Sequence, residues 1–249
     1  MITSILVTGE GSSDMGGSNN GHSISSGASY NLGPMALLAV RLLRNILPTW
    51  NEEYLDFQSP NNWMTCISGN ELANQTKTLS KYRPSKKIQK GYSEHANRAF
   101  AMANYAQQHG HQLAIYFHDT DKGDFDALRD ALRLGFSSVE NVQSVPMLPK
   151  PTSEAWLICG RKRDPYAHCT ALETQLSGND AASAHNAPKK VLGQLLGLKA
   201  GAEPTTEQQY AEAEVVDIAC INMPSYNQFK TDLTTAIEGV CGHGTARTL

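Results

Sequence analysis

Residues 112–121 read Gln-Leu-Ala-Ile-Tyr-Phe-His-Asp-Thr-Asp, an apolar run that ends in two acidic residues. Leu113 to Phe117 has no polar alternation, as expected for a strand that is buried on both faces of a parallel sheet. Side chains alternate along a strand, so we expect Asp119 and Asp121 to point to the same side where the strand ends. The run predicts an α/β protein with two carboxylates at one edge of its sheet.

Two neighbouring carboxylates repel each other, which raises a pKa unless a cation is present, and Mg2+ prefers such oxygen ligands. Open α/β sheets also bind ligands at the carboxyl ends of their strands. A simpler interpretation stays open. Residues 119–123 can form a polar turn in which Asp124 caps a helix over 125–134.

The remaining pattern alternates strands and helices. Strands are predicted at 4–8, 63–67, 113–117 and 144–148, and helices at 34–47, 93–108 and 125–134. Right-handed crossovers arrange this order as a three-layer, Rossmann-like sandwich with a mainly parallel central sheet. Residues 16–30 are rich in Gly, Ser and Asn, and we expect a long flexible loop there.

After Pro149-Lys-Pro151 the strand pattern stops. Helices are predicted from about Thr152, at 188–196, at 207–220 and at 225–240. We therefore expect an α/β domain over 1–155 and a helical C-terminal extension over 156–249 that packs on the same domain.

Composition narrows the class of protein. Of 249 residues, 40% are hydrophobic and 18% are charged, and the net charge is −3. The sequence has no apolar run long enough for a membrane span and no basic, apolar start typical of a signal peptide. Its five cysteines are scattered, which predicts neither a disulfide framework nor a thiolate zinc site. We expect a cytoplasmic protein without a membrane partner.

Positive charge is concentrated in one segment that is opposed only by Glu94 and contains Tyr82 and Tyr92. Its basic residues are Lys77, Lys81, Arg83, Lys86, Lys87, Lys90 and Arg98. Such a segment can neutralise phosphates and stack bases, although a solvated basic loop is the commoner explanation.

A third acid, Glu10, follows the predicted strand at 4–8. Because parallel strands bring their carboxyl ends to one edge, we expect Glu10, Asp119 and Asp121 to lie within reach of a single divalent ion. Carboxylates around one or two Mg2+ ions can activate water and hold a phosphodiester during hydrolysis.

An apolar strand that ends in Glu10-Gly-Ser-Ser-Asp14 and a later one that ends in Asp119-Thr-Asp121 together resemble the TOPRIM fold. The first motif is most similar to the OLD-type (overcoming lysogenization defect) nucleases and their small stand-alone relatives. Three further motifs follow in the order of those relatives: Pro149-Lys-Pro151 with Glu154-Ala-Trp156, Pro188-Lys-Lys-Val-Leu192, and Pro224-Ser-Tyr226.

The resemblance implies a nuclease that depends on Mg2+ or Mn2+. Glu10 would be a metal ligand or general acid/base, Asp119 and Asp121 would be metal ligands, and Asp14 would hold a second metal. Glu154 either joins these ligands or is an ordinary first-turn acid favoured by the helix dipole. A role in phage defence and a partner ATPase are also implied, whereas the oligomeric state stays open.

Five lysines are candidates for binding nucleic acid. Lys86, Lys87 and Lys90 belong to the basic segment. Lys150 and Lys189 belong to the proline motifs and would steady a phosphate, although ordinary surface lysines are the alternative.

Two other classes of protein fit part of the pattern. A phosphatase of the haloacid-dehalogenase type would use Asp119 as nucleophile, but that motif normally follows the first strand. A TOPRIM-like module that binds nucleic acid or protein without cutting is the other. Gly-rich nucleotide-binding motifs are absent from the sequence, so ATP hydrolysis is not predicted.

Overall fold

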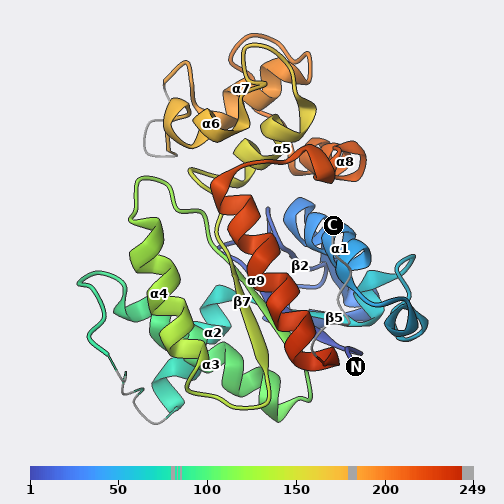
Figure 1. The fold of residues 1–249 in the computed structure, drawn as a ribbon, viewed down its shortest axis with the longest axis vertical. Coiled ribbons are helices and arrows are strands. Elements are labelled where there is room, and N and C mark those ends of the chain that lie inside the picture. Colours follow the sequence, from blue (N-terminus) through green and yellow to red (C-terminus); the bar gives the residue numbers. More distant parts are fainter. Residues whose placement is uncertain (80–81, 83, 85, 179–183, 243–249) are drawn as a thin grey trace.

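The structure, a computed structural model, describes residues 1–79, 82, 84, 86–178 and 184–242 (Figure 1). Its main sheet has the order β3-β5-β1-β6-β7. The strands are β1 (Ile5–Thr8), β3 (Ile24–Ser26), β5 (Met64–Ile67), β6 (Leu113–Phe117) and β7 (Gln143–Met147). Four of them run parallel, and β3 is antiparallel to β5 at one edge. The predicted α/β class with a mainly parallel sheet is confirmed.

Helices cover both faces of the sheet, because side chains along each buried strand alternate between two cores. Ile5 and Val7 of β1 face α1 (Pro34–Ile46), α5 (Ser153–Arg161) and α9 (Pro224–Cys241). Leu6 faces α2 (Gly69–Thr78), α3 (Ser93–Gln108) and α4 (Phe125–Phe136). The three layers are compatible with a Rossmann-like fold.

Small residues let α3 and α4 pack closely. A Cβ on Gly135 of α4 would lie 2.2 Å from the Ala96 carbonyl oxygen and 2.8 Å from Cβ of Ala99. We expect Gly135→Ala to lower the free energy of unfolding by about 1–3 kcal/mol, because the clash outweighs a helix-propensity gain of about 1 kcal/mol. Urea denaturation measures this, with Asp130→Ala at an exposed position of α4 as control. An unchanged or higher stability of Gly135→Ala would contradict the packing argument.

Residues 16–30 are not the long flexible loop that their composition suggested. They contain β2 (Gly16–Ser18), β3 and a 3-10 turn (Gly27–Ser29), and β4 (Tyr30–Leu32) pairs antiparallel with β2. The Tyr30 hydroxyl donates to the Met15 carbonyl oxygen at 2.5 Å. Backbone pairing rather than apolar side chains forms these strands, and Gly16 adopts the positive φ of 83° that begins the hairpin.

The helical C-terminal region divides into two parts. Helices α5, α6 (Cys169–Gln175), α7 (Pro188–Leu195) and α8 (Thr206–Val215) form a group at one end of the molecule, whereas α9 returns along β7 (Figure 1). The helix predicted at 207–220 is shorter than expected, because α8 ends at Val215 and a separate 3-10 turn spans Ile218–Cys220. Of the helices described, none is both long and apolar enough to cross a bilayer.

Short 3-10 turns at Thr49–Tyr54 and Pro60–Asn62 connect α1 to β5. A disulfide joins Cys159 at the end of α5 to Cys169 at the start of α6. The expectation that the scattered cysteines form no disulfide is therefore wrong for this pair. The chain turns back after Lys162, which takes a left-handed φ of 49°, and so brings two distant cysteines together.

Candidate functional site

The candidate site lies at the carboxyl ends of β1 and β6, which are neighbours in the sheet. The parallel strands run β5-β1-β6-β7 across the sheet, so the first strand lies next to the third. Chain connections diverge on either side of such a pair, and open α/β sheets bind their ligands in the crevice at this point. Glu10 follows β1 and Asp119 follows β6, so both acids come from the two strands that flank it.

Asp119 is the buried acid of the site, with a side chain in contact with α5. The Ser153 amide donates a hydrogen bond to its Oδ1 at 2.9 Å. Burial raises the pKa of Asp119 well above its usual range, and the charges of Asp14, Glu154 and Glu10 raise it further. Acids from three separate parts of the chain therefore act on one buried carboxyl group.

Ser153, the first residue of α5, connects two of these acids. Its hydroxyl donates to Oδ1 of Asp14 at 2.8 Å, while its amide donates to Asp119. Ser13 donates to the other oxygen of Asp14 at 2.9 Å. The amino end of a helix suits negative charge, because its first amides have no partner within the helix. The start of α5 thus holds Asp14 and Asp119 together.

Glu154 follows in the first turn of α5 and is also buried. It accepts hydrogen bonds from the Thr152 hydroxyl at 2.6 Å and from Nε2 of Gln209 on α8 at 3.4 Å. Burial is the main cause that raises its pKa, Asp14 adds to the rise, and Lys189 opposes it. Glu154 is thus a buried acid in the first turn of α5, and its charge acts on Asp119.

Glu10 does not lie free at the end of β1. Its Oε1 contacts Nδ1 of His118, and about 42% of the Glu10 side chain is exposed. The His118 ring packs against His95 of α3 with 4.5 Å between the ring centroids. Burial lowers the pKa of His95 to about 4, and His118 and Arg98 contribute. His118 was not singled out in the sequence, although it directly precedes Asp119.

The expectation that Asp121 continues the alternation of the strand is wrong. Strand β6 ends at Phe117, and Asp121 takes a left-handed φ of 47°. Its amide donates to the Pro151 carbonyl oxygen at 2.8 Å, and the Thr120 amide donates to that of Pro149 at 3.0 Å. Residues beyond Phe117 form a turn fixed by the proline segment, so a period of two no longer orients their side chains.

The carboxylates at this edge of the sheet are also the candidates for holding a metal ion. Among the residues that the structure describes, no three His, Cys, Asp or Glu side chains are close enough together to hold a metal ion. The structure therefore does not bring Glu10, Asp119 and Asp121 within reach of a single divalent ion, as the sequence predicted. The donor chemistry nevertheless fits a hard divalent cation, because such cations prefer oxygen ligands and Ser153 bonds the carboxylates of both Asp119 and Asp14.

A pocket of about 260 Å³ adjoins Glu10. Its walls are mainly glycine backbone and serine hydroxyls from the β1–β3 region and from the start of α2. They include Gly9, Glu10, Gly11, Ser12, Gly16, Gly17, Ser18, Ser25, Ser68, Gly69 and Asn70. Such walls present hydrogen-bonding groups and little bulk, so an extended polar ligand can approach the backbone closely.

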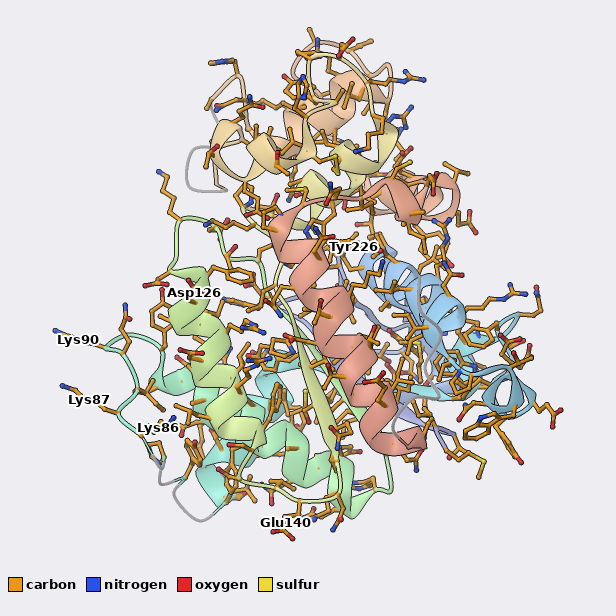
Figure 2. The ribbon with its side chains drawn as sticks, in the orientation of Figure 1. Lys86, Lys87, Lys90, Asp126, Glu140 and Tyr226 are labelled. Carbon is orange, nitrogen blue, oxygen red and sulfur yellow. A yellow bond between two sulfur atoms is a disulfide. The ribbon has the colours of Figure 1, made fainter. Side chains whose placement is uncertain are left out.

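The basic segment lies on the side of α4. Lys86, Lys87 and Lys90 are exposed and point outward beside this helix (Figure 2), and the first two line a surface pocket with Arg133. Lys81 and Arg83 lie outside the described residues. Lys150 is half-buried in the connection between β7 and α5, and Lys189 is half-buried at the start of α7.

Neither tyrosine of the basic segment is available for stacking bases as expected. The Tyr82 ring stacks on Phe100 with 5.2 Å between centroids. The Tyr92 hydroxyl accepts a hydrogen bond at 2.7 Å from the amide of Asp124, the residue that caps α4 as predicted. The segment thus retains its charge but uses its aromatic rings for packing.

Comparison of the chain with protein-family models, curated proteins and solved structures finds no match.

Proposed function

We propose that this protein is a metal-dependent nuclease with a TOPRIM-like site of the OLD type, which hydrolyses phosphodiester bonds in nucleic acid. One observation carries the proposal. Asp119 is buried, Ser153 at the start of α5 bonds both Asp119 and Asp14, and the charges of Asp14, Glu154 and Glu10 raise the pKa of Asp119 at the point where open α/β sheets bind ligands. A divalent cation bound beside Asp119 and Asp14 would compensate the charges that raise this pKa.

The residues have distinct roles in this proposal. Asp119, Asp121 and Glu10 would hold Mg2+ or Mn2+, with Asp14 and Glu154 as further ligands. A bound divalent ion polarises a phosphoryl oxygen and lowers the pKa of coordinated water. The Ser153 amide and hydroxyl keep Asp119 and Asp14 in place, and Thr152 and Gln209 do the same for Glu154.

Nucleic acid is the proposed substrate because three polar features adjoin or flank the acids. The glycine- and serine-walled pocket adjoins Glu10. The charge of Lys189 acts on Glu154, and Lys150 lies in the connection between β7 and α5. Lys86, Lys87 and Lys90 form a separate basic surface that would contact phosphates farther along the strand. A role in phage defence with a partner ATPase belongs to the same proposal and rests on the sequence resemblance.

The decisive experiment incubates DNA and RNA with the protein and Mg2+ or Mn2+. We expect wild type to cleave and Asp119→Ala Asp121→Ala to be at least about 100-fold slower, since the variant lacks two carboxylates of the site. Asp126→Ala Asp130→Ala, which removes two exposed acids from α4, is the matched control and should cleave like wild type.

Three other results of this experiment would contradict the proposed nuclease activity. Equal cleavage by wild type and Asp119→Ala Asp121→Ala would mean a contaminating nuclease. Release of phosphate from small phosphomonoesters, abolished by Asp119→Asn, would indicate a phosphatase of the haloacid-dehalogenase type. Tight binding of nucleic acid without cleavage would indicate a non-cutting module.

A further inference from the structure

We propose that the pocket beside Glu10 binds a phosphate group of the nucleic acid, other than the phosphate that is cleaved. The ends of β1 and β5, strand β3 and the start of α2 contribute its walls. The inference rests on the proposed function for the source of the phosphate, whereas binding of the phosphate itself is measured without cleavage. It adds a contact with substrate that is separate from the acids bonded by Ser153.

Ser25, the middle residue of β3, has a hydroxyl group that faces this pocket. Only 4% of the residue is exposed, and it forms part of the pocket wall. Within the described part of the chain the hydroxyl makes no hydrogen bond, and it is not among the unpartnered groups that protein encloses completely. Buried polar groups nearly always have a partner, so this hydroxyl needs one that occupies the pocket.

The start of α2 brings backbone donors to the same pocket. Gly69 and Asn70 are the first two residues of this 10-residue helix, and both line the pocket. Neither amide donates to another group among the described residues, as is usual in the first turn of a helix. Ser68 caps the helix by accepting from the Glu71 amide at 3.2 Å, so its hydroxyl proton can still be donated. Free amides at a helix start favour a phosphate group.

The size and walls of the pocket suit a phosphate with its sugar rather than a base. Its volume of about 260 Å³ lies below the roughly 300–1,000 Å³ of pockets that enclose drug-sized ligands. None of the described residues that line it is Phe, Tyr or Trp, on which a base would stack.

Glu10 also lines the pocket, and its negative charge opposes a phosphate. A divalent ion at the acids would offset this charge. We therefore expect the pocket to bind phosphate more tightly in Mg2+ than in EDTA.

Titration with inorganic phosphate, followed by NMR of the backbone amides, tests the pocket without cleavage. In wild type we expect saturable shifts of the Gly69 and Asn70 signals that chloride of equal ionic strength does not produce. Ser25→Ala should weaken binding about 10-fold, because it removes one hydrogen bond to a charged group, and the larger Ser25→Val should abolish it. Ser144→Ala removes another unpartnered hydroxyl, on β7, and should bind phosphate like wild type.

A second pair of variants tests the backbone donor at the start of α2. Gly69→Pro removes one amide, and the preceding Ser68 already has the extended conformation that proline requires, with φ −69° and ψ 149°. Gly69→Ala is its control, since it adds a Cβ, at 3.3 Å from the Gly9 carbonyl oxygen, but keeps the amide. We expect Gly69→Pro to bind phosphate about 10-fold more weakly than Gly69→Ala.

Short single-stranded oligonucleotides in EDTA, with and without a 5′-phosphate, show which phosphate of the strand is bound. Tighter binding of the phosphorylated form, lost in Ser25→Val, would assign the terminal phosphate. Equal weakening of both forms by Ser25→Val would assign an internal one. The proposal is overturned if phosphate gives no saturable shift at Gly69 and Asn70, or if Ser25→Val and Gly69→Pro bind it like wild type. Either result leaves the nuclease intact, whereas absence of cleavage with normal phosphate binding would refute the nuclease alone.

Discussion

Replacing Asp119 by Asn should make the metal-free protein more stable at neutral pH, by about 1–2 kcal/mol, while abolishing its activity. Functional sites often hold groups that destabilise the fold, and their removal gives gains of this size. Asp119 is buried, and three acids repel its charge. Asn keeps an oxygen that can accept the hydrogen bond from the Ser153 amide, so the substitution removes the charge without breaking that contact.

The stability difference should depend on pH in a defined direction. Burial, followed by Asp14, Glu154 and Glu10, raises the pKa of Asp119 in the folded protein above its unfolded value. Between these two pKa values the folded protein binds more protons than the unfolded protein, so wild-type stability falls as pH rises. The advantage of Asp119→Asn should be absent below the usual Asp range and complete above the raised pKa. Denaturation with urea in EDTA, measured at a series of pH values, tests this.

Divalent metal should make wild type more stable than Asp119→Asn, the reverse of the order expected without metal. Ligand that binds only the folded state stabilises it by about 2.7 kcal/mol at one hundred times its dissociation constant. Wild type should therefore gain stability in Mg2+ or Mn2+, and Asp119→Asn should gain little. Asp126→Asn on the exposed surface of α4 serves as control and should behave like wild type. If metal-free Asp119→Asn protein is less stable than wild type at neutral pH, the charge of Asp119 is already compensated in the wild-type fold.

Elements with a strong apolar period were predictable from the sequence. Helix α3 spans the predicted residues 93–108, and β6 spans 113–117, because their apolar side chains repeat with the period of each structure. Proline gave sharp boundaries as well, at the start of α1 and of α9. The parallel arrangement was predicted too, and it places Glu10 and Asp119 at one edge of the sheet. The strand order was not predicted.

Features built from backbone or from distant side chains were not predictable. The hairpin of β2 and β4 has no apolar pattern, since its residues are held by main-chain hydrogen bonds. Asp121 lies in a turn whose partners are carbonyl groups some thirty residues later in the chain. The contact between Glu10 and His118 depends on the rotamers of two partly exposed side chains, which a single sequence does not specify.

The second large effect is expected at the edge strand β7, which α4 and α9 cover from the two helical layers. Nε and Nη2 of Arg129 donate hydrogen bonds to the Asp232 carboxylate at 2.9–3.2 Å. Nη2 of Arg133 donates another at 2.8 Å. The Asp232 side chain is about 8% exposed. Asp232→Ala would leave Arg129, whose side chain is about 16% exposed, without this counter-charge. We expect a loss of about 3 kcal/mol in the free energy of unfolding, because removing one partner of a buried pair leaves the other uncompensated.

The double variant Arg129→Leu Asp232→Leu distinguishes this cause from a general loss of packing. If the uncompensated charge is responsible, the double variant should recover most of the lost stability, since apolar residues often replace a buried ion pair without loss. Asp130→Ala on the same helix should change stability by less than about 0.5 kcal/mol. Equal losses in Asp232→Ala and in the double variant would mean that packing between α4 and α9, rather than charge, holds the edge of the sheet. Because β7 leads directly to the carbonyl groups that fix residues 120 and 121, the same variants would show whether a stable edge is required for an ordered site.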